Sequence, residues 1–521
     1  MYQKDIKFNE IPLQLKYIVK DIDKEKVKNF RWFQDKANNI FDILLHDYAV
    51  LYDDNAAIII AAVIDFSIGI ADSKERKLSR YFVPLIIRKD IEDKNYIGII
   101  KGSGFTAYLY DAVDDIHYIR FVDSLLSSNK NIDFNNGGRL EAFKLIDYDI
   151  YKSERFSNKS TNSLTFLKKD EIIKTFRRMM PGINPDLEMT MMLKQNGFNS
   201  IEDIRGYFQY IDKEKNIYTI AMIFEYIENI IDMWQFTQEY LKGILEKFAY
   251  MGDIPLEYIK KSSEDYLAEI KKIAGIIADM HIILSKISTN SFLKKNPKES
   301  DVKELISGIN NKYNQLLNYL KDGIFDKETK EMFEKIAHQK DVIEKASKYI
   351  VKLYPYFGQY IRCHGDLHLE QILKTEESYI IIDFEGEPTK PIQERNKKVS
   401  PLKDIAGILR SFDYAVYSAY FNYKDAYNSS ESELKNIEEF LLLWEDIVEE
   451  TFIYTYLKIV KLYAPDILPD EKRLDMIILL FKLDKALFEG IYEINNRPEW
   501  VKIPLKGIIK CLEGLGNNQI M

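Results

Sequence analysis

The segment formed by residues 363–388 constrains the fold and the chemistry of this chain more than any other. It reads C-H-G-D-L-H-L-E-Q-I-L and, after a short polar stretch, Y-I-I-I-D-F-E-G-E-P. An acid, Asp366, is followed by an amide, Gln371, and then by a second acid, Asp383. The apolar run at residues 379–382 predicts a buried strand that delivers Asp383 at its end. The sequence therefore predicts a loop and a strand that together carry three polar side chains.

Phosphoryl transfer requires such a set of side chains. One carboxylate orients and deprotonates an alcohol, while an amide and another carboxylate hold the metal ions that neutralise the phosphates. Protein kinases use H-R-D-x-x-x-x-N followed by D-F-G, and the spacing from Asp366 to Gln371 matches that catalytic loop. A chance acidic loop beside a strand is the alternative. We predict that the chain transfers a phosphate group.

Composition limits the classes of protein that the chain can belong to. With 521 residues, 46% of them hydrophobic and 30% charged, it is predicted to be a soluble globular protein of two to four domains or lobes. The net charge of −9 argues against a general nucleic-acid binder, although a local basic pocket for ATP is still allowed. Two cysteines, Cys363 and Cys511, exclude a disulfide framework and indicate buried thiols in a reducing cytoplasm.

Neither a targeting segment nor a membrane span is predicted. Residues 1–9 contain charges throughout and lack the apolar core of a signal peptide. The longest apolar run, at residues 56–64, is far shorter than the roughly 20 residues that cross a bilayer. We interpret this run as a buried strand and expect a cytoplasmic protein without a membrane partner.

The chain is predicted to contain three parts. Short apolar strands and one helix at about residues 114–126 form an N-terminal cap, residues 1–130. Residues 131–228 form an intermediate lobe with nucleotide-binding elements. Apolar positions at helical spacing recur at residues 266–284, 302–320, 437–459 and 476–494. Residues 229–521 are therefore predicted to form a helical C-terminal lobe.

The intermediate lobe contains candidate nucleotide-binding residues. Lys174 lies on a predicted strand, and Glu188 lies in the first turns of a predicted helix that is capped near Asn184. In kinases the glutamate of such a pair holds the lysine in place to bind the phosphates. Alternatively, both residues could simply be solvated. The turn at residues 157–163, which includes Ser160, is predicted to cover the phosphates. Because this turn has no glycine-rich pattern, its backbone amides and hydroxyls would have to bind the phosphates.

Several polar residues beside the central motif are candidate substrate contacts with structural alternatives. His364, a candidate substrate contact, and His368 flank Asp366 and could suggest a metal site, or their imidazoles could bond to the loop backbone. Glu385 and Glu387 could bind sugar hydroxyls or a second metal ion, or be solvated.

Arg410 is a further candidate for binding a phosphate or a hydroxyl group. It lies in L-R-S-F-D-Y, where a salt bridge with Asp404 or with Asp413 is an equal contender. The sequence leaves these alternatives open.

A predicted helix near the C-terminus presents one polar face. Lys485, Glu489, Tyr492 and Asn496 recur at spacings of four, three and four residues. This face could present donors and an aromatic platform to a sugar. An exposed salt bridge between Lys485 and Glu489 would explain the two charges without any ligand.

Beyond this reading of the residues, the chain resembles the maltokinases, a branch of the aminoglycoside-phosphotransferase-like kinases. The matching segments are spread over most of its length and include H-G-D-L-H-L-E-Q-I-L, I-I-I-D-F-E-G-E-P, S-P-L-K-D-I-A-G-I-L-R-S-F-D-Y-A and N-N-R-P-E-W. The resemblance implies an α+β, bilobal protein-kinase-like fold with a cystatin-like cap and a mainly helical C-terminal lobe. It also implies ATP and Mg²⁺ as cofactors, and phosphorylation of maltose at the anomeric hydroxyl to give maltose 1-phosphate for glycogen synthesis. We expect a monomer.

The resemblance also assigns roles to residues. Asp366 becomes the catalytic base, and Gln371 and Asp383 become the magnesium ligands. The remaining assignments are the phosphate-anchoring pair Lys174 and Glu188, the adenine-binding hinge Glu225, Tyr226 and Ile227, and the sugar wall with Lys485 and Tyr492.

The chain departs from the family pattern at three positions. It has Glu370 where members usually carry glycine, Leu367 where they carry an aromatic residue, and Phe488 where they carry tyrosine. Because a related group phosphorylates glucosamine, the extra acid at Glu370 could favour an amino sugar or could be solvated. The alternatives are a kinase for glucosamine, choline or an aminoglycoside, and a catalytically inactive binding protein with a kinase fold.

Overall fold

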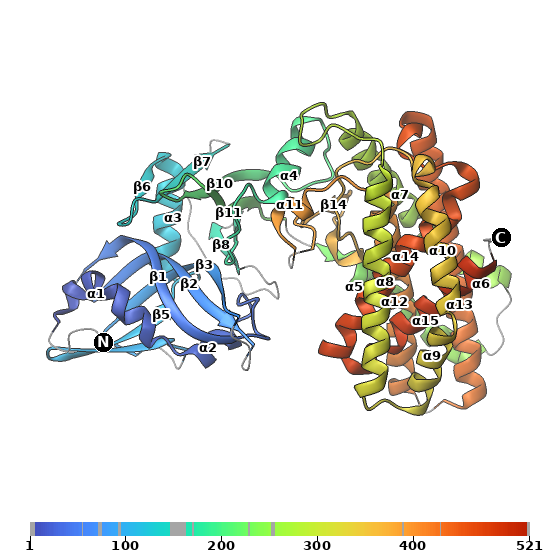
Figure 1. The fold of residues 1–521 in the computed structure, drawn as a ribbon, viewed down its shortest axis with the longest axis horizontal. Helices are drawn as coiled ribbons and strands as arrows, with labels where there is room; N and C mark the ends of the chain where they lie inside the picture. Colours follow the sequence, from blue (N-terminus) through green and yellow to red (C-terminus); the bar gives the residue numbers. More distant parts are fainter. Residues whose placement is uncertain are drawn as a thin grey trace. The chain divides into compact units, whose positions relative to one another are not determined.

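A computed structural model describes residues 6–54, 56–70, 75–91, 95–145, 163–168, 171–227, 230–251, 256–387, 390–427 and 429–517. The chain forms two compact units (Figure 1). The first comprises Met1–Met191 and Glu202–Glu228, and the second comprises Met192–Ile201 and Asn229–Met521.

The first unit contains an antiparallel five-stranded sheet in which one inner strand, formed by residues 57–69, is buried on both faces. The strand order is β1 (Asn39–Asp53), β2 (Ala57–Gly69), β3 (Lys77–Arg88), β5 (Phe105–Asp111) and β4 (Gly98–Gly102). On one face Ile58 and Ile60 pack in a core with α1 (Ile11–Ile18) and α2 (Lys24–Asn29). On the other face Ile59 and Ala61 pack with α3 (Ile116–Ser128). Burial on both faces explains why the run is continuously apolar, and the predicted buried strand is confirmed.

A six-stranded sheet completes the first unit. Its order is β6 (Asn131–Asp133), β7 (Arg139–Lys144), β10 (Ile204–Ile211), β11 (Ile217–Glu225), β9 (Glu171–Thr175) and β8 (Ser163–Lys168). The predicted helix that follows β9 is α4 (Pro185–Gln195), and Asn184 caps it by accepting from the Asp186 amide at 2.9 Å. We propose that this unit divides near residue 130, because one sheet lies on each side of that position.

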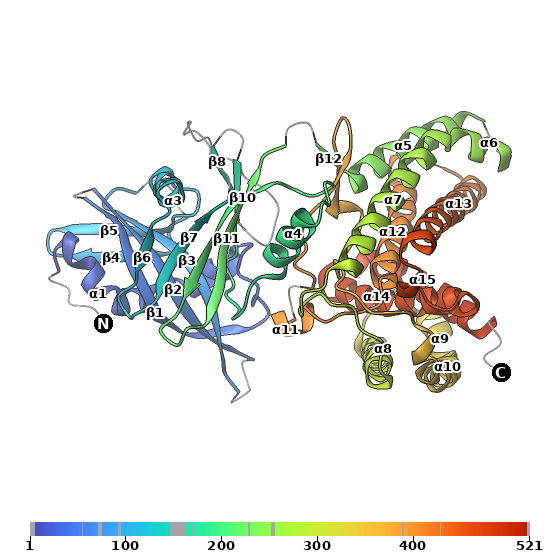
Figure 2. The ribbon, with the colours of Figure 1, turned by 90° about the horizontal axis from the view of Figure 1, so that it is seen from above.

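The second unit is mainly helical. Its helices are α5 (Met233–Met251), α6 (Leu256–Ser262), α7 (Glu264–Lys286), α8 (Glu299–Asp322), α9 (Lys327–His338), α10 (Lys340–Lys352), α11 (Ile392–Arg395), α12 (Leu402–Ala426), α13 (Glu431–Tyr463), α14 (Leu474–Asn496) and α15 (Lys502–Asn517). The four stretches of helical periodicity lie within α7, α8, α13 and α14, which confirms those predictions. Helices α8, α9 and α10 pack on one side of α14 and α15, while α5, α7 and α13 lie on the other side (Figure 2).

A small sheet in the second unit carries the motif that the sequence singles out. It consists of β12 (Ile231–Asp232), β13 (Ile372–Lys374) and β14 (Tyr379–Ile381). The predicted strand before Asp383 is β14, and residues 363–371, which we term the H-G-D loop, precede β13. In the described residues no helix has both the length and the apolar content that a bilayer span requires.

Helix α12 approaches the H-G-D loop at a glycine, and this contact generates a prediction. A Cβ atom added at Gly407 would lie 2.3 Å from the backbone oxygen of Leu367. We expect Gly407→Ala to displace the loop and to lower the free energy of unfolding by about 1–3 kcal/mol, the usual cost of overpacking. Urea denaturation measures this change.

The matched control is Gly308→Ala in α8, where an added Cβ meets no atom within 4 Å. This variant should be stabilised by up to about 1 kcal/mol, since alanine favours a helix over glycine. Equal stability changes in the two variants would contradict the proposed contact.

Candidate active site

The H-G-D loop and the β13–β14 hairpin bring the amide and the second acid together. The Gln371 Nε2 atom donates to Asp383 Oδ2 at 3.2 Å, and the Ile382 amide donates to the Gln371 carbonyl at 3.0 Å. Asp383 has φ = +66°, in the left-handed region that aspartate tolerates better than most residues. The two side chains thus form a cluster of oxygen-bearing groups of the kind that Mg²⁺ prefers.

Asp366 forms an ion pair with Lys485 on α14, the helix predicted near the C-terminus. Its Oδ1 atom lies 2.7 Å from Lys485 Nζ, and the two side chains are 31% and 27% exposed. Burial raises the pKa of the Asp366 carboxyl, but the charge and hydrogen bond of Lys485 outweigh it, so the pKa lies well below its ordinary value. Asp366 is therefore ionised throughout the neutral range.

His368 lies close to both acids and is neutral at pH 7. Burial lowers the pKa of its imidazole to about 4, although the carboxylates of Asp366 and Asp383 oppose this shift. Its Nε2 atom is 3.3 Å from Gln371 Nε2. A neutral imidazole here supports the amide without adding positive charge to the cluster.

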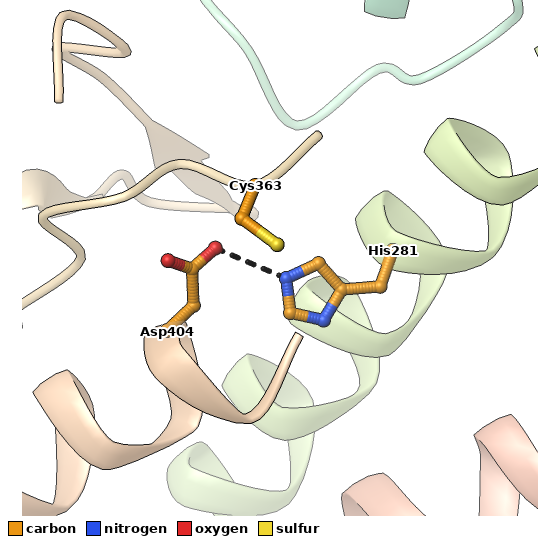
Figure 3. Close-up of side chains that lie close together, drawn as sticks. All are labelled: His281, Cys363 and Asp404. Carbon is orange, nitrogen blue, oxygen red and sulfur yellow. Dashed lines mark hydrogen bonds and ion pairs between the residues drawn. The ribbon is translucent and has the colours of Figure 1, made fainter. Parts of the chain in front are cut away.

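A buried carboxylate in the first turn of α12 holds the H-G-D loop. Asp404 accepts from the His364 amide with Oδ2 and from the Gly365 amide with Oδ1, both at 2.8 Å. Its Oδ2 also lies 3.1 Å from His281 Nε2 (Figure 3). The other ring nitrogen of His281 bonds to the Tyr456 hydroxyl at 2.8 Å. Gly365 has φ = +87°, a conformation that favours glycine. Sequence reasoning missed this role of Asp404, because nothing in its local pattern points to the loop.

Cys363, His281 and Asp404 approach one another closely enough to suggest a metal site. Their ligand atoms all lie within 4.8 Å of one another (Figure 3). However, hydrogen bonds engage both Asp404 oxygens and both His281 nitrogens, and burial raises the pKa of the Cys363 thiol well above its ordinary value. Because metals bind thiolate, this network fits a structural role better than a metal site.

The structure assigns the predicted substrate contacts to different environments. His364 is buried, and its Nε2 atom bonds to the Ile382 carbonyl at 2.9 Å, which supports the alternative of bonding to the backbone. Glu385 is also buried, and the Arg395 guanidinium donates to its carbonyl at 3.1 Å. Tyr492, by contrast, is 46% exposed on α14.

Arg410 is enclosed by acids. It is 1% exposed, and its guanidinium lies 2.5 Å from Asp413 and 2.8 Å from Glu489. The structure therefore favours the salt bridge with Asp413 over one with Asp404, and an arginine enclosed in this way is poorly placed to contact a ligand. The spacing of three residues from Arg410 to Asp413 could have indicated this choice, because it places both on one helical face.

The first unit contains the predicted nucleotide-binding lysine. Lys174 on β9 forms a buried ion pair of 2.7 Å with Asp186 in the first turn of α4. Sequence reasoning missed Asp186, and the pairing of Lys174 with Glu188 stays a prediction. Ser160 lies outside the described residues.

The predicted hinge follows strand β11. Glu225 at its end forms an ion pair of 2.9 Å with Arg205. The Tyr226 ring packs edge-on against the Phe166 ring, with 4.7 Å between the ring centres. Ile227 is the last described residue of this segment. Binding of adenine by Glu225, Tyr226 and Ile227 stays a prediction.

Comparison with solved structures defines the class of fold. Two crystal forms of glucosamine kinase align with TM-scores of 0.59 and 0.61, at 15% and 14% identity. They cover 90% and 96% of this chain, and 91% and 99% of their own chains. A glucosamine kinase in complex with glucosamine, ADP and inorganic phosphate aligns over 95% of this chain and 98% of its own, with a TM-score of 0.57 and 15% identity. The predicted kinase-like α+β fold is confirmed.

Sequence comparison gives more limited likenesses. The glucosamine kinase of Streptacidiphilus jiangxiensis is 23% identical over 145 residues, which cover 28% of this chain and 30% of that protein. The glucosamine kinase of Mycolicibacterium smegmatis is 26% identical over 141 residues, which cover 27% and 32%. The chain thus aligns with about a third of each of these relatives. No protein-family model matches it.

The contacts of Asp404 generate a second prediction. Asp404→Asn replaces one acceptor oxygen by an NH₂ group that faces the loop amides, so at least one buried donor loses its partner. We expect a loss of about 1–3 kcal/mol in unfolding free energy. Asp425→Asn, an exposed change in the same helix, should stay within about 0.5 kcal/mol of the parent protein. Thermal and urea denaturation of both variants provide the measurement. Equal stability of the two variants would contradict the role of Asp404 in holding the H-G-D loop.

Proposed function

We propose that this chain is an ATP-dependent kinase that transfers the terminal phosphate of ATP to a hydroxyl group of a sugar. The observation that carries this proposal is the arrangement of the second unit: an ionised Asp366 paired with Lys485, with Gln371 bonded to Asp383 on the adjoining hairpin. The likeness in fold to glucosamine kinases along nearly the whole chain supports it.

In this proposal Asp366 orients the acceptor hydroxyl. Lys485 holds Oδ1, and we assign Oδ2 to accept the hydroxyl proton. Because the low pKa makes this carboxylate a weak base, its main contribution is to align the nucleophile with the phosphate. Alignment of the nucleophile rather than strong basicity suits a loose transition state, in which little proton transfer is needed before the phosphate moves.

Asp383 and Gln371 fit Mg²⁺, since a carboxylate and an amide oxygen are hard donors. A half-turn of the Gln371 amide presents Oε1 instead of Nε2 to an ion beside Asp383. When bound, Mg²⁺ neutralises the charge of the ATP phosphates. In the first unit we assign the phosphates to Lys174, whose buried ion pair with Asp186 fixes its ammonium.

Glucosamine is the acceptor that we favour. The relatives and the aligned structures are glucosamine kinases, and one of those structures contains glucosamine and ADP. The carboxyl of Glu370 would attract the ammonium group of an amino sugar. Maltose is the second candidate, because the D-F-E-G-E-P, S-P-L-K-D and N-R-P-E-W segments resemble those of maltokinases.

Phosphorus NMR tests both the reaction and the acceptor. The protein is incubated with Mg²⁺–ATP and either glucosamine or maltose, and we expect a new phosphate monoester signal with the former. Asp366→Asn should lower turnover by at least ~10²-fold, while Asp425→Asn keeps the parent rate. No sugar phosphate with either acceptor, or an active Asp366→Asn variant, would refute the proposal.

The ion pair of Asp366 predicts a shift of the pH dependence. Its low pKa keeps Asp366 ionised, so kcat/KM should fall only when the pH drops through that low value. In Lys485→Met burial is no longer opposed by the lysine charge, and the pKa of Asp366 rises. We expect the acidic limb of the kcat/KM profile to move to higher pH. Lys330→Met, an exposed change on α9, should leave the limb in place. An unmoved limb in Lys485→Met would argue against Asp366 as the titrating group.

A further inference from the structure

A basic pocket lies in the second unit, next to the start of the H-G-D loop. Its cavity of about 310 Å³ is lined by four cationic side chains and by two asparagines: Lys295, Arg362, Lys397, Lys398, Asn290 and Asn396. The proposed chemistry uses none of these residues. A concentration of positive charge in a chain with a net charge of −9 calls for an explanation.

Backbone hydrogen bonds fix the three segments that form the pocket. The segment between α7 and α8 pairs with the chain before the loop through Lys295 and Tyr360, whose mutual bonds measure 2.8 and 3.0 Å. Ile361 and Val399 exchange bonds of 2.9 and 3.0 Å, which attach the segment before α12. The cationic side chains therefore project from a rigid frame.

Arg362 is built into the wall of the pocket. It is 1% exposed, its Nη2 atom donates to Asn396 Oδ1 at 2.9 Å, and its guanidinium lies 4.9 Å from the centre of the Phe292 ring. A buried arginine held by an amide and an aromatic ring is preorganised. It can offer a planar set of donors without further loss of side-chain entropy.

The charges around the pocket are only partly balanced. Helix α8 supplies two acids, of which Asp301 lies 3.1 Å from Lys295 and Glu304 pairs with Lys397. Lys398 donates to the Asn290 carbonyl at 3.0 Å and has no carboxylate within ion-pair distance in the described part of the chain. Burial, and then the charges of Arg362 and Lys295, lower the pKa of Lys398. An anion in the pocket would relieve this repulsion.

The chemistry and the size of the pocket define the class of anion. Guanidinium, ammonium and amide donors together suit the oxygens of a phosphate group, which carries nearly two negative charges at neutral pH. The volume is at the lower end of the range for small-molecule sites and exceeds what a phosphate group alone fills. We propose that this pocket binds a small molecule through a phosphate monoester group, with the asparagine amides contacting its polar remainder.

This position would link the ligand to the proposed active site. Arg362 is followed directly by Cys363 and by His364, whose amide Asp404 holds. Asn396 follows Arg395, which donates to the carbonyl of Glu385, two residues after Asp383. A ligand that joins Arg362 and Lys398 would therefore stiffen the segment that leads into the H-G-D loop and the segment that leads into α12.

Isothermal titration calorimetry of the full chain tests the proposal. Inorganic phosphate and a hexose 6-phosphate are titrated at constant ionic strength in the presence of saturating Mg²⁺–ADP, which occupies the proposed nucleotide site. We expect saturable binding that weakens by roughly tenfold or more in Lys398→Met, because a charge-assisted hydrogen bond is lost. Tighter binding of the hexose phosphate identifies an organic ligand, and equal binding identifies free phosphate; either result supports the site.

Lys330→Met is the matched control, since it removes one exposed positive charge far from the pocket residues in sequence and should bind as the parent chain does. Absence of saturable binding in the parent chain would overturn the proposal. Equal binding in Lys398→Met and in the control would overturn it as well. Failure here is independent of the sugar-kinase proposal, which phosphorus NMR tests without this pocket.

Discussion

The carboxylate of Asp404 is the constraint on which the candidate site depends. A buried aspartate that accepts two consecutive backbone amides fixes the path of the chain just before Asp366. Its place in the first turn of α12 suits its negative charge, because the positive end of the helix dipole lies there. His281 on α7 orients the same carboxylate. Two core helices thus determine where the loop begins, which leaves the loop itself free to carry exposed polar groups.

A chain of alternating charges connects the other end of the site to the helical core. Asp366 pairs with Lys485, and one helical turn further along α14, Glu489 pairs with Arg410 of α12. Arg410 reaches α15 so closely that a Cβ added at Gly507 would lie 2.0 Å from its guanidinium. The position of the proposed base therefore depends on the packing of three helices, because each charge is held by the next.

The parts that sequence reasoning predicted are local in character. Helical periodicity, the doubly buried β2 and the capping of α4 by Asn184 depend on neighbours along the chain, and so does the spacing of Asp366, Gln371 and Asp383. Sequence reasoning could not predict which side chains pair with one another. Asp186 and Glu188 both lie in the first turn of α4, and the rotation of that helix against β9 is set by tertiary packing. Asp366 and Lys485 are 119 residues apart along the chain, so no local sequence pattern could predict their contact.

The backbone of Asp383 adds a consequence for how this site is maintained. A residue other than glycine in the left-handed region costs about 1 kcal/mol or more. Judged by conformation alone, glycine would suit that position better. Glycine at this position would relax the main chain, but it would also remove the carboxylate that the proposed magnesium site needs.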